Sequence, residues 1–87
     1  MKSTRAEVYA VLDGERDHQD AGPADYIAPA SALSVGDEIL LMEQYLSQAR
    51  AAWARSGAPE TAALEEIRKV TAMGVRCMQT NGAIPRR

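Results

Sequence analysis

The sequence has one cysteine, one histidine, no phenylalanine and a net charge of only −2 over its 87 residues. A single cysteine excludes an intramolecular disulfide and a cysteine-based zinc cluster, and it is typical of a reducing compartment. The weak charge provides no overall basic field for binding nucleic acid directly. No apolar run approaches the roughly 18 residues of a membrane span, and the basic start of the chain lacks the apolar segment of a signal peptide. We therefore expect a cytoplasmic protein without membrane or nucleic-acid partners.

The remaining composition is that of an ordinary globular protein, with 46% apolar and 25% charged residues. A chain this short forms one domain with a thin core. Periodicity predicts three helices, over residues 4–19, 35–55 and 59–80. An irregular loop over 20–33 separates the first two helices, and a short basic tail occupies 83–87. The predicted fold class is all-α, a small three-helix bundle that forms a single domain.

The ends of these helices carry specific sequence signals. Thr4 and Glu7 have the spacing of a capping box, in which each side chain accepts a hydrogen bond from the backbone of the other residue. Ser34 is a good N-cap for the second helix, and Asn81 followed by Gly82 is a typical end for the third.

The second helix carries more apolar surface than one neighbouring helix can cover. One stripe repeats at alternating steps of three and four residues, and a second stripe of Leu41, Tyr45 and Ala52 runs beside it. Small helical proteins often gain stability by association, so we expect a homodimer or a higher symmetric oligomer. A monomeric three-helix bundle is the alternative. The first stripe consists of Ile39, Met42, Leu46, Ala49 and Trp53.

The first helix begins apolar and ends polar along a single face. Val8, Val11 and Leu12 form the apolar part, and the same face continues into Glu15 and Gln19. Polar groups directed inward are costly unless they are paired, so this end of the helix is a candidate for binding a polar ligand. A solvated helix end is the alternative.

The third helix combines an apolar side with several cations. Lys69 and Arg76 are seven residues apart and are expected to share a face, with Arg68 beside them. Arginine can hold a phosphate through two N–H groups, and a tyrosine can stack on a base. The alternative is that these cations are solvated and paired, as the i, i+4 spacing of Glu65 and Lys69 suggests. The predicted buried side of this helix consists of Leu64, Ile67, Val70, Thr71, Gly74, Cys77 and Met78. The candidate ligand-binding residues are Tyr9, Arg16, Gln19, Tyr26, Arg68, Lys69 and Arg76.

Three segments resemble the MazG-like all-α nucleotide pyrophosphohydrolases. They are Glu15-Arg16-x-x-Gln19, the segment over 35–40 and the segment over 64–70. The resemblance implies a helical nucleotide-binding architecture and, in an enzyme, magnesium held by Glu38, Glu43, Glu65 and Glu66.

The motifs of that family are nevertheless altered in this chain. The family has a Glu-x-x-Glu motif and a Glu-x-x-Asp motif, whereas Leu41 stands three residues after Glu38 and cations stand three residues after Glu65 and Glu66. No nucleophile and base can be paired from the sequence either. We therefore predict no catalytic residue and no cofactor, and magnesium is expected only if the protein is a pyrophosphohydrolase.

The second half of the chain also resembles small helical proteins of tailed phages, through the segments 63–70, 74–78 and 82–87. That resemblance implies an anti-defence factor in the cytoplasm of a host cell, which acts by sequestering a signalling nucleotide or by occupying a host protein. The leading hypothesis is thus a non-catalytic helical oligomer that binds a small anionic ligand, a nucleotide signal of host defence. The alternatives are a protein–protein inhibitor of a host defence complex and a MazG-like pyrophosphohydrolase.

Overall fold

The computed structural model describes most of the chain and confirms the all-α prediction. The described residues are 2–22, 33–55, 57 and 59–87. They form three helices and contain no strand. Two candidate features, Tyr26 and most of the 20–33 loop, lie outside the described residues.

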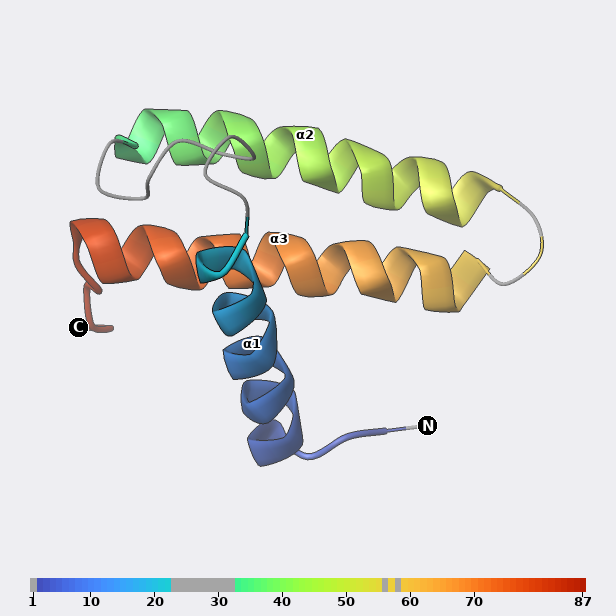
Figure 1. Ribbon diagram of the computed structural model, residues 1–87, viewed down its shortest axis with the longest axis horizontal. Coiled ribbons are helices and arrows are strands. Elements are labelled where there is room, and N and C mark those ends of the chain that lie inside the picture. Colours follow the sequence, from blue (N-terminus) through green and yellow to red (C-terminus); the bar gives the residue numbers. More distant parts are fainter. Residues whose placement is uncertain (1, 23–32, 56, 58) are drawn as a thin grey trace.

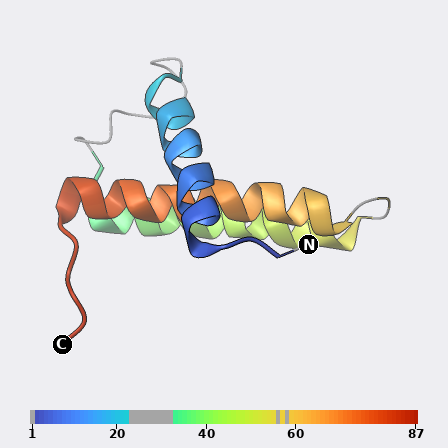
Figure 2. The same ribbon diagram turned by 90° about the horizontal axis from the view of Figure 1, so that it is seen from below.

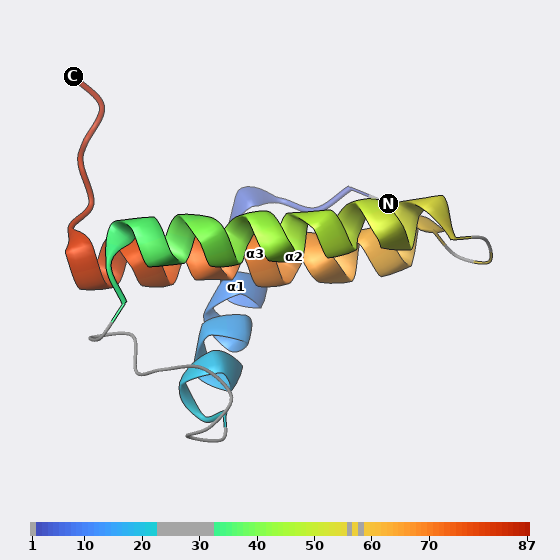
Figure 3. The ribbon, with the colours of Figure 1, turned by 90° about the horizontal axis from the view of Figure 1, so that it is seen from above.

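Two long helices lie side by side and antiparallel, and the first helix crosses one of them. α1 spans Arg5–Asp20, α2 spans Val35–Ala54 and α3 spans Pro59–Asn81, each bound lying within one residue of the prediction. Within the described residues, α1 contacts α3 but not α2. Figures 1 and 2 show that α1 runs across the direction of the α2–α3 hairpin and projects away from it. Figure 3 shows that the segment after α3 turns away from the helices near the start of α2.

The predicted helix ends are confirmed in atomic detail. The backbone N–H of Glu7 donates to Thr4 Oγ1 at 3.1 Å, and the Thr4 N–H donates to Glu7 Oε1 at 2.8 Å. Ser34 and Asp37 form a second capping box with distances of 3.1 and 3.0 Å. At the end of α3, Gly82 has φ +113° and donates its N–H to the carbonyl of Met78, a conformation for which glycine is the favoured residue.

The core of the described residues is small and rich in alanine. Its apolar members are Leu12, Ala49, Ala52, Ala63, Ala72 and Met73. Alanine side chains let two helices approach closely but remove little apolar area from water. The side of α2 that packs on α3 combines the second stripe, in which Ala52 is buried and Leu41 and Tyr45 are half-buried, with the edge of the first stripe, in which Ala49 is buried and Met42 is half-buried.

The prediction of which side of α3 is buried was wrong for the largest residues of that side. Leu64, Ile67 and Met78 are exposed, and the positions that are buried in their place include Met73 and Arg76. The reason is that α3 is contacted by α1 and α2 on its alanine-containing sides, which leaves the leucine and isoleucine positions uncovered. In α1, likewise, Leu12 is buried but Val8 and Val11 are exposed.

One ion pair lies inside the hairpin. Arg76 donates from Nε to Glu38 Oε2 at 3.2 Å and from Nη2 to Glu38 Oε1 at 2.6 Å, and the two side chains are only 6% and 2% exposed. Two parallel hydrogen bonds of this kind fix the relative position of the two helices as well as satisfying both charges. The sequence had placed both residues in candidate sites, Glu38 with magnesium and Arg76 with a phosphate.

None of the helices in the described part of the chain is long and apolar enough to cross a membrane.

Removing one member of the buried pair is expected to destabilise the fold. Arg76→Met leaves the Glu38 carboxylate buried without its partner, which lowers the free energy of unfolding by about 3 kcal/mol. The double variant Glu38→Met/Arg76→Met loses less than either single variant, because no unpaired charge remains. Urea unfolding followed by circular dichroism measures all three, and Arg86→Met in the exposed tail is the control. Equal losses for Arg76→Met and Arg86→Met would contradict a structural role for the pair.

The capping boxes predict a dependence of stability on pH. The hydrogen bond from the Thr4 backbone, and next that from its hydroxyl, lower the pKa of Glu7 below its ordinary 4.5. Ser34 lowers the pKa of Asp37 below 3.8 in the same way. A carboxyl whose pKa is lowered by folding stabilises the fold above its ordinary pKa and loses this contribution as the pH falls through the lowered value. The melting temperature should therefore fall as the pH drops below about 4.5.

In the variant Glu7→Gln/Asp37→Asn, this acid-induced fall in melting temperature becomes shallower. The control Asp13→Asn/Asp17→Asn removes the same number of exposed carboxylates from α1 without touching a cap. An equal change in both variants would show that overall charge, not capping, causes the pH dependence.

Candidate functional site

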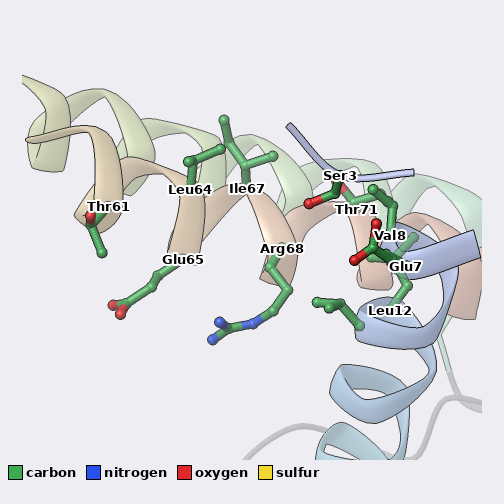
Figure 4. Close-up of a pocket in the computed structure, with 11 residues that line it drawn as sticks. Ser3, Glu7, Val8, Leu12, Thr61, Leu64, Glu65, Ile67, Arg68 and Thr71 are labelled. Carbon is green, nitrogen blue, oxygen red and sulfur yellow. The ribbon is translucent and has the colours of Figure 1, made fainter. Parts of the chain in front are cut away.

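A groove of about 610 Å³ lies between the first half of α1 and the first half of α3. Its walls are largely apolar, with Val8, Val11 and Leu12 from α1 opposite Leu64 and Ile67 from α3. Figure 4 shows these side chains together with the polar groups at the edge of the groove. Those polar lining residues are Ser3, Glu7, Thr61, Glu65, Arg68 and Thr71.

Arg68 provides the only positive charge among the residues that line this groove. Its Nε donates to Glu15 Oε1 at 2.7 Å, and the side chains of Arg68 and Glu15 are 37% and 9% exposed. Within the described part of the chain, neither Nη group of Arg68 has a hydrogen-bond partner. In Figure 4 the Arg68 side chain extends from α3 into the space between Glu65 and Leu12. The guanidinium is therefore held at one nitrogen while its other two can bind a ligand.

The groove also contains two carboxylates. Glu7 is engaged by Thr4 in the capping box, which lowers its pKa and keeps it ionised at neutral pH. Glu65 lies one turn before Arg68 on α3. Both carboxylates repel an anion, and Arg68, although paired with Glu15, is the one lining residue whose N–H groups can bind an anion directly. A ligand with a single anionic part at the Arg68 Nη groups and an apolar remainder therefore fits the groove best.

The polar end of α1 points inward, as its sequence predicts. Arg16 is buried and donates to Gln79 Oε1 at 2.8 Å, to Gln19 Oε1 at 3.0 Å and to Asp20 Oδ1 at 2.9 Å. Gln19 in turn donates to the backbone carbonyl of Lys69 at 3.3 Å. The Arg16 bonds use all three of its nitrogens, and the bonds to Gln79 and to the Lys69 carbonyl fasten α1 to α3.

The candidate cations of α3 lie in three different environments. Lys69 forms an ion pair with Glu66 at 3.1 Å, not with Glu65 as the sequence suggested, because the side chain turns toward the i−3 residue. Arg76 is buried against Glu38, and Arg68 alone reaches the groove. The structure therefore brings Arg68, Lys69, Arg16 and Gln19 to the crossing of α1 and α3 but places Arg76 between α2 and α3.

Tyr9, the remaining described candidate, is 59% exposed on α1 and does not line the groove.

The four glutamates of the pyrophosphohydrolase hypothesis do not converge. Among the described residues, no three histidine, cysteine, aspartate or glutamate side chains are close enough together to hold a metal ion. Glu38 is engaged by Arg76 and Glu66 by Lys69, although one buried oxygen of Glu66 has no partner in the described part of the chain.

Comparison of the chain with protein-family models, with curated proteins and with solved structures found no match.

The attachment of α1 to α3 provides a test of this geometry. Glu15→Gln removes the charge that holds Arg68 and should lower the free energy for local opening of α1. Because the ion pair is partly exposed, the expected loss is only about 1 kcal/mol, which corresponds to roughly fivefold faster amide exchange. Hydrogen exchange followed by mass spectrometry should show the increase in α1 and not in α2. Asp13→Asn, an exposed position on the same helix, is the matched control. Faster exchange in both variants would mean that the ion pair does not hold α1.

Proposed function

We propose that the protein is a non-catalytic helical oligomer that binds a nucleotide signal of host defence in the groove between α1 and α3 and sequesters it. The observation that carries the proposal is the position of Arg68, whose two Nη groups face an apolar groove while Glu15 holds its Nε. The phage setting rests on the resemblance of the α3 segment to proteins of tailed phages.

The size and chemistry of the groove support a small ligand. A volume of about 610 Å³ falls within the range of about 300–1,000 Å³ in which small molecules are usually bound. A guanidinium binds phosphate oxygens through paired N–H groups, and Val8, Val11, Leu64 and Ile67 offer an apolar surface to a base and sugar. A nucleotide combines both parts in one molecule.

Several neighbouring residues would support such binding without touching the ligand. Glu15 restricts the Arg68 side chain, which reduces the conformational entropy lost when a ligand binds. The Arg16 and Gln19 bonds hold α1 against α3 and so maintain the width of the groove.

Calorimetry against a panel of cyclic and linear nucleotides tests the proposal. We expect binding by wild-type protein and a dissociation constant raised about 10- to 100-fold in Arg68→Met, because a charged hydrogen-bonding group is lost. Arg55→Met is the matched control, since it removes one positive charge from an exposed position outside the groove. The same samples assayed with magnesium for pyrophosphate release distinguish sequestration from hydrolysis. Absence of binding across the panel, or an equal effect of both substitutions, would refute the proposal.

A further inference from the structure

Four large apolar residues along one side of α2 are left exposed by the described residues. Val35, Ile39, Leu46 and Trp53 are 48%, 47%, 56% and 58% exposed. Between them lie Met42, which is half-buried, and Ala49, which is buried, at the edge of the stripe next to α3. The six positions follow alternating steps of four and three residues along the whole helix. This spacing is the pattern by which one helix packs along another in a coiled coil. We call these six residues the α2 stripe.

The α2 stripe continues onto α3. Gly74 lies against Met42, so that a Cβ at Gly74 would be 3.8 Å from the Met42 sulfur. The exposed residues Ile67 and Met78 lie on the same side of α3 as Gly74, at steps of seven and four residues from it. The hairpin therefore presents a two-helix apolar face and not a single row of side chains.

The exposed residues of this face are of the kinds that form interface cores. Val35, Ile39, Leu46 and Trp53 of α2 and Ile67 and Met78 of α3 are 44% to 58% exposed. Aromatic residues and methionine are enriched in the cores of protein–protein interfaces, so this face suits a macromolecular occupant.

The charges beside the stripe indicate which occupant fits. Glu43 and Arg50 are exposed on one flank of the α2 stripe, three residues before and four residues after Leu46. Neither forms an ion pair with any of the described residues. If a second α2 lies antiparallel with Leu46 at the crossing, Glu43 of each copy meets Arg50 of the other. In a parallel pair the two flanks lie on opposite sides of the seam, and these charges do not meet.

We propose that this face binds a second copy of the same chain, with the two α2 helices antiparallel about a twofold axis near Leu46. The two hairpins then form a four-helix bundle whose core contains the large apolar residues that one copy leaves exposed. The inference rests on the oligomeric part of the proposed function and does not require that the groove bind a ligand.

Analytical ultracentrifugation of matched variants tests the interface. Wild-type protein at about 100 µM should sediment as a dimer or as an assembly of dimers. Leu46→Glu places two carboxylates at the twofold axis and should weaken association about 100-fold or more, to a folded monomer by circular dichroism. Leu40→Glu makes the same substitution on the same helix, at an exposed position outside the stripe, and should leave association unchanged. A monomeric wild type, or equal effects of the two variants, would overturn the proposal.

Charge exchange tests the antiparallel orientation. Glu43→Arg and Arg50→Glu should each weaken association about tenfold, because each single variant creates a pair of like charges at both symmetry-related contacts. The double variant should restore association, because opposite charges meet again. Failure of the double variant to restore association would overturn the orientation. Arg68→Met should weaken nucleotide binding about 10- to 100-fold without changing the sedimentation, so failure of the interface and failure of the groove give different results.

A cysteine cross-link gives a second measurement of the interface that does not require a charge to be introduced into it. Leu46→Cys in a Cys77→Ser background should form a disulfide between copies on mild oxidation, because two residues at a twofold axis meet each other. Leu40→Cys in the same background should not. Cross-linking through both positions, or through Leu40→Cys alone, would contradict the proposed axis.

Discussion

The hairpin of α2 and α3 depends on the buried pair of Glu38 and Arg76. The apolar contacts between these helices are made largely by alanines, which resemble one another in shape and therefore define the relative position of two helices only weakly. A bidentate ion pair is different, because a shift by one turn would leave both charges buried and unpaired. The pair thus fixes which residue of α2 faces which residue of α3. It thereby also fixes which side of each helix is left outside.

Polar contacts have a similar role at the second helix junction. α1 is fastened to α3 by the buried Leu12, by the Glu15–Arg68 ion pair and by two hydrogen bonds. One bond runs from Arg16 to Gln79 and the other from Gln19 to the backbone carbonyl of Lys69. The consequence is that most of the cations that could have bound an anion are engaged inside the protein. Arg68 differs from the others because Glu15 binds only its Nε. Its two Nη groups therefore make it a candidate ligand-binding residue as well as a member of a structural ion pair.

The sequence predicted the helices well because the signals for helix ends are local. Thr4 with Glu7 and Asn81 with Gly82 act over three or four residues, so they can be read without knowing the fold. The inward direction of Glu15 and Gln19 also followed from helical periodicity. The partners of the charged side chains could not be predicted in this way, since Glu38 and Arg76 are 38 residues apart and Arg16 and Gln79 are 63 residues apart.

The buried faces were harder to predict for a different physical reason. Periodicity shows that a face of a helix is apolar, but it does not show whether that face is covered within one chain or by another. α2 has two apolar stripes, and the sequence predicts only that together they are wider than one neighbouring helix can cover. The structure buries the alanine of each stripe, Ala49 and Ala52, and leaves the large side chains of Leu46 and Trp53 exposed.

The exposed face and the groove share part of α3, and this has a thermodynamic consequence. Leu64, Ile67 and Thr71 line the groove and also lie on the side of α3 that continues the α2 stripe. A second copy seated on the stripe would therefore border the groove, and any contact that it made with a bound ligand would link binding to association. Such linkage is reciprocal: a ligand that binds the assembly more tightly than the single chain strengthens the assembly by the same factor. The large apolar residues of α3 would then both contact the second copy and form one wall of the ligand site. These two roles give a physical reason for their exposure in the single chain.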